Sequence, residues 1–439
     1  MMRVLFLTHQ FLPRHLGGTE LYTLALAREL LGNGAEAQVV TYVESPAADP
    51  AEFQLAHTVV QDVPVTEIHY NLSVAPWRAR YEYANPFTEH QLDGILRQVR
   101  PDLVHATHLM KVGGAALRPA LRRRLPIVAT LTDFWAVCGR HTLLRSNGQL
   151  CRGPRHPLDC LPCLRDTYGF TRARSWPGVH PLSLTLARRA LRTGRLWPSE
   201  LVGDLAAIPF RNPFLRGVLR QLSRIVVLSE FQRRLLVENG LPDHALEVVP
   251  HGLEPIPDLG PPPRVDPRRF AFVGSLVPHK GLHILVEALA LDPSLEVRLD
   301  VYGDSSSASA YVTDLKQRLG SDRRITWKGT LPPDELAAAL RGCAGLVMPA
   351  QWYENSPLVV QLALTLGVRV LASRLGTLEE MLAGRPGHLL LPARDATAWA
   401  EALRRAISGG LPVPVPVADL PTWRAHARRI FEIYHEVSA

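Results

Sequence analysis

The stretch RVLFLTHQFLPRHLGGTELYTLALARELLGNGAEAQVVTY, residues 3–42, decides the fold of the first part of the chain. Its first six residues, RVLFLT, form a short apolar run, and the loop HQFLPRHLGG follows. The segment TELYTLALARELLGNG then has helical periodicity and stops at Gly32 and Gly34, before a second apolar run, AQVVTY. The order strand, loop, helix, strand predicts the first unit of an alternating α/β domain.

Further short apolar runs follow and predict more strands, at residues 102–107, 126–132, 224–229 and 246–250. Helical segments lie between most of these runs. Strands that alternate with helices predict a parallel sheet that is covered by helices on both faces.

A proline-rich break, PIPDLGPPPRVDP at residues 255–267, predicts a stiff linker, and the alternation restarts after it. We therefore predict two doubly wound, Rossmann-like α/β domains. The first covers residues 1–255, with a cysteine-rich insert at about 138–165, and the second covers residues 268–421. The amphipathic segment 422–439 is expected to be a helix that packs back on the first domain. Ligands of open α/β sheets bind beyond the carboxyl ends of the strands, so the two domains are expected to face each other across a cleft.

Length and composition indicate a globular protein with more than one domain. A chain of 439 residues suggests two or three domains at about 150 residues each. No apolar run approaches the ~18 residues that a membrane span needs. The start MMRVLFLTHQF lacks a small-residue cleavage site and is interpreted as a strand, not as a signal peptide. We expect a cytoplasmic protein.

Arginine is concentrated in one part of the chain. Residues 165–224 contain 11 Arg, no Lys and 3 acidic residues, which accounts for the whole net charge of +8. An Arg-rich, partly amphipathic segment suits anionic lipid, an anionic acceptor or nucleic acid, although a solvated face in an Arg-rich protein explains it equally well. No nucleic-acid-binding motif accompanies the charge, so nucleic acid is not expected as a partner. Peripheral contact with the inner face of the membrane stays open.

In the second domain, one lysine and one acid precede predicted helices. Lys280 follows a strand that ends at Gly274 and lies near a helix start, where the helix dipole disfavours a cation. A base in that place usually serves an anion, but a lysine that points to water would look the same. Glu354 would repel a phosphate, so it fits better as an acceptor for sugar hydroxyls beside one. The alternative for Glu354 is an ordinary acid that stabilises the dipole of the helix ending at Gly367.

The start of that helix predicts an anion site. Ser356 is expected to be the N-cap and Pro357 the first helical residue. The free backbone N–H groups of Leu358 and Val359 would then point out of the helix, where an anion can bind. The informative feature of this domain is the order of its motifs. A glycine turn with a lysine comes first, and later an acid precedes a helix whose N-terminus can bind a phosphate.

This order resembles the nucleotide-sugar half of glycosyltransferase family 4, a retaining group with the GT-B fold. In the second domain the resemblance rests on FVGSLVPHKGLHILVEAL, WKGTLPPDEL and VMPAQWYENSPLVVQLALTLGVRVLAS, and in the first on GGTELYTLALARELLGNG and VVPHGLE. It covers nearly the whole chain except about 140–220. It implies a hexosyltransferase-like enzyme, of the kind used in polysaccharide biosynthesis, with a nucleotide-sugar donor and a glycan, lipid-linked or small-molecule acceptor. A dinucleotide-dependent oxidoreductase is not expected, because the first turn lacks G-x-G-x-x-G.

The resemblance also implies roles for individual residues. The leaving diphosphate would be held without a divalent metal by a helix N-terminus and by Lys280. Glu354 would orient the sugar, and Asp133 would contact sugar or acceptor from the other domain. The expected reaction is a front-face substitution in which the departing phosphate oxygen helps to take the acceptor's proton. These three residues are the expected catalytic set, and the residues expected at the donor are Gly17, Gly18, Ser275, Lys280, Gly329, Thr330, Glu354, Asn355, Ser356, Leu358 and Val359.

Three positions depart from the family's pattern. Ser275 stands where members usually have an arginine, and Thr132 stands where they often have a histidine. Leu362 stands where the family has a second glutamate that holds the ribose. Because leucine accepts no hydrogen bond, donor binding is expected to be weaker by about 1.5–3 kcal/mol unless another group substitutes. The alternative function is a catalytically impaired GT-B scaffold that binds a glycan or a partner protein.

Four of the five cysteines fall close together, with the spacing C-x12-C-x8-C-x2-C; they are Cys138, Cys151, Cys160 and Cys163. Without a secretory signal, such a set favours a metal site over disulfides. A structural zinc ion is expected, with an iron–sulfur cluster as the alternative. His141 and His156 are spare ligands if one cysteine is not used, and the lone Cys343 is expected in the core.

Overall fold

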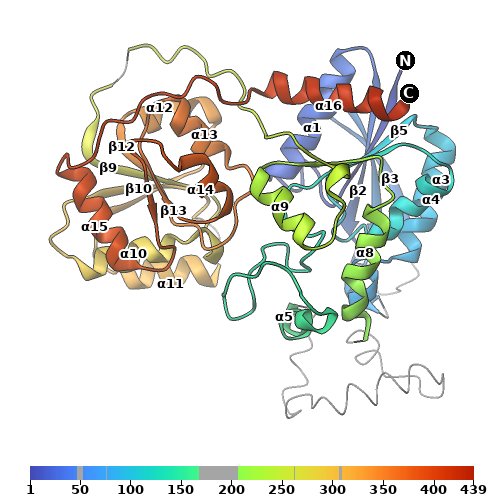
Figure 1. Ribbon diagram of the computed structural model, residues 1–439, viewed down its shortest axis with the longest axis horizontal. Coiled ribbons are helices and arrows are strands. Elements are labelled where there is room, and N and C mark those ends of the chain that lie inside the picture. Colours follow the sequence, from blue (N-terminus) through green and yellow to red (C-terminus); the bar gives the residue numbers. More distant parts are fainter. Residues whose placement is uncertain (47–52, 76, 168–205, 262, 306–308) are drawn as a thin grey trace, which may run out of the picture. The chain divides into compact units, whose positions relative to one another are not determined.

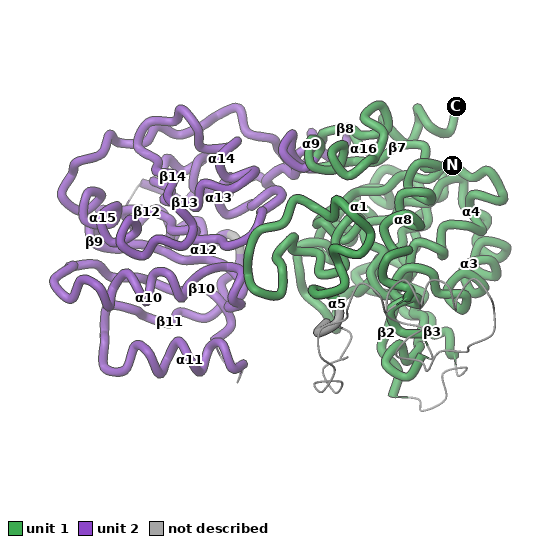
Figure 2. Tube along the Cα trace, turned by 60° about the horizontal axis from the view of Figure 1, so that its bottom comes forward, with its two compact units in different colours: residues 1–227, 233–248, 429–439 green, residues 228–232, 249–428 purple. Residues whose placement is uncertain are grey.

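The computed structural model describes residues 1–46, 53–75, 77–167, 206–261, 263–305 and 309–439 (Figure 1). These residues form two compact units, which are coloured separately in Figure 2. Unit 1 comprises residues 1–227, 233–248 and 429–439, and unit 2 comprises residues 228–232 and 249–428. Among the helices of the described residues, none combines the length and the apolar character that a membrane crossing requires.

The strands of unit 1 are β1 (Arg3–Thr8), β2 (Glu36–Glu44), β3 (Phe53–Val60), β4 (Val63–Tyr70), β5 (Leu103–Ala106), β6 (Ile127–Thr130), β7 (Arg224–Val227) and β8 (Leu246–Val248). They form one sheet in the order β3-β4-β2-β1-β5-β6-β7-β8. Neighbours pair in parallel, apart from the antiparallel hairpin of β3 and β4. The central strands β5 and β6 are buried along their whole length, which explains why they are mostly apolar in the sequence.

The hairpin of β3 and β4 was not predicted from the sequence. Strand β3 lies at the edge of the sheet and is largely exposed, so it carries no apolar run. Strand β4 is buried, but two of its buried residues, Thr66 and Glu67, are polar. Burial of polar side chains interrupts the hydrophobic pattern from which strands are predicted.

The helices of unit 1 are α1 (Gly18–Gly32), α2 (Arg78–Tyr81), α3 (Pro86–Val99), α4 (Arg118–Arg122), α5 (Leu161–Thr167) and α8 (Arg211–Leu219), together with most of α9 (Glu230–Glu238) and the end of α16 (Trp423–Ser438). Local chemistry explains where several of them begin. For α3, the Asn85 side chain accepts from the Phe87 N–H at 2.9 Å, and Pro86 occupies the first helical position.

The C-terminal helix α16 is tied to unit 1 by buried and ionic contacts. Tyr434 is fully buried, and its hydroxyl lies 2.5 Å from Nδ1 of His105 on β5. Arg429 Nε donates to Glu247 Oε1 at 2.6 Å, and Arg429 NH1 donates to Glu436 Oε1 at 2.7 Å. The predicted helix at 422–439 is therefore present, and its last turns pack on the sheet of unit 1.

The strands of unit 2 are β9 (Asp266–Val273), β10 (Arg298–Tyr302), β11 (Ile325–Gly329), β12 (Cys343–Met348), β13 (Val370–Ser373) and β14 (Leu389–Leu391). They form a wholly parallel sheet in the order β11-β10-β9-β12-β13-β14. This is the strand order of a doubly wound, Rossmann-like domain. The prediction of two parallel-sheet α/β domains is therefore confirmed.

The helices of unit 2 are α10 (Leu282–Leu291), α11 (Ala310–Leu319), α12 (Pro333–Arg341), α13 (Leu358–Thr365), α14 (Gly376–Leu382) and α15 (Ala396–Ile407). They bury the two faces of the sheet in separate clusters. Phe270 and Phe272 of β9 pack in the cluster that holds α10, α11 and α15, while Ala271 between them packs in the cluster with α12, α13 and α14. Alternate residues of a strand point to opposite faces, so each helix layer has its own core.

The proline-rich segment 255–267 does not form a free linker. Ile256 and Leu259 pack against the second of these clusters, and Arg341 NH1 donates to the Leu259 carbonyl at 2.9 Å. The segment belongs to unit 2 because its apolar side chains find a partner surface on that unit.

Strand order places the functional edge of each sheet. In unit 1 the order reverses between β1 and β5, and in unit 2 it reverses between β9 and β12. Ligands of such sheets bind beyond the carboxyl ends of the strands at this switch point. The loops that follow β1, β5 and β6 in unit 1, and β9 and β12 in unit 2, are therefore the places to search.

Candidate active site

Two loops meet at the switch point of unit 2. The loop after β9 passes through a 3-10 turn at Pro278–Lys280 and then through Gly281, which has a φ of +81°. The Gln351 N–H of the loop after β12 donates to the His279 carbonyl at 2.8 Å. A Cβ on Gly281 would lie 1.8 Å from the Pro349 carbonyl oxygen, so only glycine permits this approach. The two loops therefore hold Lys280 and Glu354 against each other.

Lys280 and Glu354 form a largely buried ion pair. Lys280 Nζ lies 2.7 Å from Glu354 Oε1, and the side chain of Glu354 is 7% exposed. The indole N–H of Trp352 donates to the same oxygen at 2.6 Å, and the lysine ammonium lies 5.2 Å from the centre of the Trp352 ring. The His279 ring contacts the Trp352 ring in a tilted arrangement, with centroids 4.8 Å apart. The sequence predicted the lysine and the acid but neither their pairing nor the tryptophan.

The helix after Glu354 begins one residue later than predicted. Helix α13 starts at Leu358, its N-cap is Pro357, and no side chain caps it. Ser356, the predicted cap, instead accepts a hydrogen bond from Gln361 Nε2 at 3.1 Å. The first-turn amides of Leu358 and Val359 remain the expected anion donors, because the first N–H groups of a helix have no partner within it.

The positions that depart from the family pattern have distinct surroundings. Ser275 is exposed in the loop after β9. Leu362 is 8% exposed and packs in the apolar cluster of α12, α13 and α14. Thr132 lies in unit 1, where its hydroxyl is 2.7 Å from that of Thr19 on α1. Leu362 thus contributes to the domain core.

Three glycines line the ends of adjacent strands in unit 2. Gly274 follows β9 with a φ of +152°, and Gly329 ends β11 with a φ of +72°. Gly303 follows β10, and a Cβ there would lie 2.3 Å from the Gly274 carbonyl oxygen. The Gly303 N–H donates to the Gly329 carbonyl at 2.9 Å, and Thr330 beyond it is exposed. The predicted donor residues Ser275, Gly329 and Thr330 therefore lie at the carboxyl ends of β9 and β11, the two strands that flank β10.

In unit 1 the corresponding edge carries a histidine–carboxylate pair. His108 Nε2 lies 2.9 Å from Asp133 Oδ2, and the Met110 N–H donates to His108 Nδ1 at 3.1 Å. The acceptor role of Nδ1 places the proton of a neutral imidazole on Nε2, which donates to the carboxylate. The Trp135 N–H donates to the other carboxylate oxygen at 2.8 Å. Asp133 follows β6, and His108 follows β5.

This environment keeps Asp133 ionised. Burial opposes its charge, but the neighbouring His108 and His141 and the Trp135 N–H outweigh burial and lower the pKa of Asp133 to about 2. Burial lowers the pKa of His141, although Asp133 opposes that shift. An ionised carboxylate at the edge of the sheet can accept hydrogen bonds from substrate hydroxyls.

His9, which follows β1, extends this polar group. Its ring packs on that of His108 with centroids 4.1 Å apart, and its Nε2 lies 3.7 Å from Oε1 of the buried Glu20. Burial lowers the pKa of His9 to about 2, so the imidazole is neutral at physiological pH. His9, Glu20 and His108 were not predicted as site residues, and His141 was predicted only as a spare metal ligand. The sequence signal that could have identified His9 and His108 is their position, because these polar residues come shortly after the ends of β1 and β5.

The glycine pair at the start of α1 has two different surroundings. Gly17 is the N-cap of α1, and a Cβ there would lie 2.6 Å from Glu20 Oε2. Gly18 has open space at the position of a Cβ. Gly17 therefore lies beside Glu20 of the polar group of unit 1, while Gly18 faces open space at the start of the helix.

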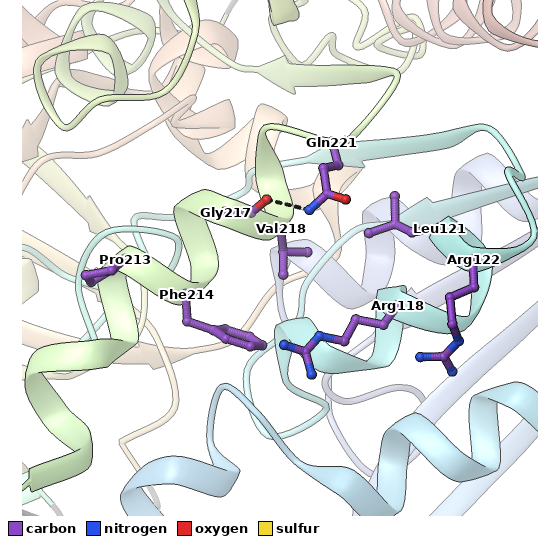
Figure 3. Close-up of a pocket in the computed structure, with 8 residues that line it drawn as sticks. All are labelled: Arg118, Leu121, Arg122, Pro213, Phe214, Gly217, Val218 and Gln221. Atoms are coloured by element: carbon purple, nitrogen blue, oxygen red, sulfur yellow. Dashed lines mark hydrogen bonds between the residues drawn. The ribbon is translucent and has the colours of Figure 1, made fainter. Parts of the chain in front are cut away.

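A cavity of unit 1 with a volume of about 660 Å³ is separate from these residues. It lies between α4 and α8, and Figure 3 shows the Arg118 side chain directed towards the Phe214 ring. Arg118 and Arg122 both pair with Glu89, at 3.6 Å and 2.6 Å. Their charges are compensated within the protein, and the cavity does not lie at the switch point of the sheet. We therefore do not assign the substrate to it.

Most of the arginine-rich segment 165–224 lies outside the described residues, since 168–205 are not among them. The described arginines near its end contact the protein itself. Arg211 is 2% exposed and donates to the Trp135 carbonyl, and Arg220 donates to the Gly240 carbonyl at 2.8 Å. Arg224 lies 3.8 Å from Glu247. These three arginines therefore form contacts within the fold.

The clustered cysteines are free thiols that line one small cavity, together with neighbouring residues; they are Cys138, Cys151, Cys160 and Cys163. As they stand, no three or more His, Cys, Asp or Glu side chains in the described part of the chain form a ready-made metal cluster. His156, a predicted spare ligand, accepts from the Leu158 N–H and caps a short 3-10 turn. Cys343 is buried, as expected for a core residue.

Comparison with known families matches both units. Residues 17–252, more than half of the chain, match the family described as glycosyl transferase 4-like domain. Residues 267–409 match the family described as glycosyl transferases group 1. The fold and these matches define a glycosyltransferase-class protein, and the chain belongs to the glycosyl transferase 4-like family.

Curated relatives are similar over part of their length. A D-inositol 3-phosphate glycosyltransferase of Corynebacterium efficiens is 34% identical over 140 residues, which is 30% of this chain and 33% of the relative. The enzyme of the same name from Corynebacterium jeikeium is 30% identical over 195 residues, 41% of this chain and 46% of the relative. The chain therefore matches between a third and a half of the length of these relatives.

Solved structures are similar over the whole chain. A sucrose-phosphate synthase from Thermosynechococcus elongatus has a TM-score of 0.59 at 15% identity and covers 100% of this chain and 99% of its own. The Anabaena protein HepE, solved with UDP and glucose, has a TM-score of 0.58 at 16% identity and covers 100% of this chain and 98% of its own. At this identity the likeness concerns the fold alone, and it confirms the GT-B class expected from the sequence.

Proposed function

We propose that the protein transfers a sugar from a nucleotide-sugar donor to an acceptor hydroxyl, with retention of the anomeric configuration. The observation that carries the proposal is the Lys280–Glu354–Trp352 group at the switch point of unit 2. A buried ion pair with a further donor on the carboxylate is poorly explained by stability, because removing two charges from water is unfavourable. A site that binds an anion beside a polyol explains both charges.

In the proposed donor complex the diphosphate interacts with Lys280 and with the first-turn amides of α13. The lysine balances the phosphate charge, and the amides of Leu358 and Val359 donate to phosphate oxygens. Glu354 is then freed from part of its interaction with the lysine and accepts hydrogen bonds from sugar hydroxyls. Ser275, Gly329, Thr330 and Asn355 are the proposed contacts of the nucleotide and the sugar.

The proposed chemical step is a front-face substitution. The bond between the anomeric carbon and the leaving phosphate oxygen breaks on the face where the bond to the acceptor oxygen forms. The acceptor's proton passes to the departing phosphate oxygen, so no protein base is required. Lys280 and the helix amides stabilise the negative charge that develops on the leaving diphosphate.

The Asp133–His108 pair is proposed to bind hydroxyls of the acceptor or of the sugar. Asp133 is ionised and held rigidly by His108 and the Trp135 N–H, so it is preorganised as a hydrogen-bond acceptor. The curated relatives are named for D-inositol 3-phosphate, which makes a phosphorylated polyol one acceptor to test. Glycan and lipid-linked acceptors belong in the same panel.

The proposal is tested with a panel of nucleotide sugars in the presence and absence of acceptors. We expect donor binding by calorimetry, and transfer that falls by about 10²–10³-fold in Lys280→Ala and Glu354→Gln, because each removes a charged contact of the transition state. Glu354→Gln retains an oxygen that can accept from Trp352. Product anomeric configuration by NMR reports retention.

Glu287→Gln is the matched control, since Glu287 forms an exposed ion pair with Arg318 in the same unit. Normal transfer by both site variants would overturn the site. If no nucleotide sugar binds at millimolar concentration, the transferase proposal fails and the alternative, a GT-B scaffold that binds a glycan or a partner protein, takes its place.

Membrane association is a separate proposal. It rests on the arginines of segment 165–224, most of which lie outside the described residues. Flotation with liposomes that contain anionic lipid tests it independently of transfer.

A further inference from the structure

The cysteine cavity of unit 1 brings together thiols from three separate stretches of chain. Cys138 lies in the loop after β6, Cys151 follows the bridge between Leu144 and Leu150, and the other two lie in a 3-10 turn and in α5. All four line one cavity of about 30 Å³. A cavity of this size admits about one or two water-sized guests, which fits a single ion.

The backbone of Leu143 adjoins both of the first two cysteines. The Leu143 and Arg140 amides lie beside the Cys138 thiol. The Leu143 carbonyl accepts from the Cys151 N–H at 2.8 Å. Leu143 itself has a φ of +52°, which is rare for a residue with a side chain.

The second pair lies on one face of a short helical segment. Cys160 and Cys163 are three residues apart across the junction of the 3-10 turn and α5, so their side chains project to the same side. The turn is fixed by Asp159, whose Oδ2 accepts from the N–H groups of Arg155 and His156, both at 2.9 Å. Asp159 is therefore engaged in the turn, and the four thiols are the donor set of the cavity.

We propose that the four cysteines bind one structural zinc ion, which draws the thiols from cavity-lining positions to ligand distance and holds the loop that carries Asp133 and His141. Zinc takes four thiolates in tetrahedral geometry at about 2.3 Å. The guanidinium of Arg211 lies near the Cys138 and Cys160 thiols and compensates the charge of such a centre.

A short loop that is closed by backbone hydrogen bonds links Cys138 to the candidate active site. The Cys138 N–H donates to the Phe134 carbonyl at 2.8 Å, the His141 N–H donates to the Cys138 carbonyl at 2.8 Å, and the Phe134 N–H donates to the His141 carbonyl at 3.2 Å. Asp133 is the residue before this loop. An ion on Cys138 thus fixes the backbone on which Asp133 and His141 are presented.

The far side of the cavity is anchored to the body of unit 1. Arg152, next to Cys151, forms a two-pronged ion pair with Glu238, and its carbonyl accepts from Asn239 Nδ2 at 2.8 Å. A Cβ on Gly153 would lie 1.9 Å from Asn239 Oδ1, which shows how closely the loop approaches. The ion would therefore connect the Asp133 loop to a fixed support.

The test is the metal content of the purified full-length chain. We expect about one zinc per chain by elemental analysis, and tetrathiolate absorption bands after replacement by cobalt. Cys160→Ser and Cys151→Ser should lose most of the zinc. The matched control is Cys343→Ser, a buried cysteine of unit 2 whose thiol donates to the Ala339 carbonyl at 3.4 Å, and it should retain the zinc.

A second readout does not depend on the variants folding. Chelation of zinc from the unchanged protein should increase amide hydrogen exchange in residues 133–151 and leave residues 266–302 unaffected. The proposal is overturned if the protein neither contains nor takes up zinc, if Cys151→Ser retains it, or if chelation leaves exchange unchanged. If the purified protein contains iron and inorganic sulfide and absorbs visible light, the cysteines bind an iron–sulfur cluster, and the proposal of a single zinc ion is overturned.

Discussion

At the residue scale, Glu354 and Leu362 occupy two positions of the same family pattern but have different surroundings. Both belong to the pattern that suggested a nucleotide-sugar site, and both are nearly buried. Glu354 is paired by Lys280 and Trp352, so its charge is compensated. Leu362 packs with the apolar side chains of α12, α13 and α14, so the position of the missing acid is part of the hydrophobic core.

Restoring the acid at position 362 should therefore destabilise the protein. We expect Leu362→Glu to lower the free energy of unfolding by several kcal/mol, on the order of 3, because it buries an unpaired carboxylate. Thermal and denaturant unfolding measure the effect, with the volume-conserving Leu362→Met as the matched variant expected to change stability by less than about 1.5 kcal/mol. A stable Leu362→Glu protein that binds donor more tightly would contradict this account.

At the scale of elements, the site of unit 2 depends on two loops that touch. The 3-10 turn after β9 and the loop after β12 meet through one backbone hydrogen bond and through the close approach of Gly281 to Pro349. Neither strand pattern nor helix pattern predicts such a contact, because it joins residues about 70 positions apart in sequence.

Gly281→Ala should separate these loops. The new methyl group would overlap the Pro349 carbonyl, in addition to the strain of about 1–2 kcal/mol for a left-handed residue with a side chain. We expect a lower melting temperature and a marked loss of donor affinity, measured by calorimetry. Gly384→Ala is the control, since Gly384 has a φ of +74° but open space around a Cβ. If the two substitutions change donor affinity equally, the contact between the Gly281 and Pro349 loops does not determine donor binding.

At the scale of the whole molecule, buried neutral histidines occur in both units. Burial lowers the pKa of His9 in unit 1 to about 2, and in unit 2 it lowers the pKa of His251 to about 3 and of His426 to about 4. In the unfolded chain these groups titrate near 6.5. Between the two pKa values the unfolded chain binds protons that the folded chain excludes, so stability rises with pH in this range.

Acidification should therefore destabilise the protein well above the pKa of its carboxylates. At pH 5.5 each such histidine lowers the free energy of unfolding by about 1.4 kcal/mol relative to neutral pH. Melting temperatures across pH 5–8 test this expectation. His9→Gln should flatten the profile, whereas His90→Gln, at an exposed position, should leave it unchanged. If the melting temperature of the unchanged protein is constant from pH 5 to 7, these histidines are not buried in their neutral form.

Much of the architecture was predictable because it depends on patterns local to each segment. Apolar runs of strand length and helical periodicity indicated both α/β sheets, and family motifs indicated Lys280 and Glu354. The hairpin of β3 and β4 was missed because an edge strand and a strand with buried polar residues both lack the apolar pattern. His9 and His108 were missed because each looks ordinary in its own segment.

The sequence by itself therefore determined the class of fold, the family and the residue types available for chemistry, since these are carried by local periodicity and short motifs. Tertiary structure decided which of those residues meet. It paired Lys280 with Glu354 and Trp352, stacked His9 on His108 beside Asp133, and gathered four thiols around one cavity. The physical reason is that parallel strands deliver distant loops to a common edge, and only the strand order, set by packing of the whole sheet, fixes which loops become neighbours.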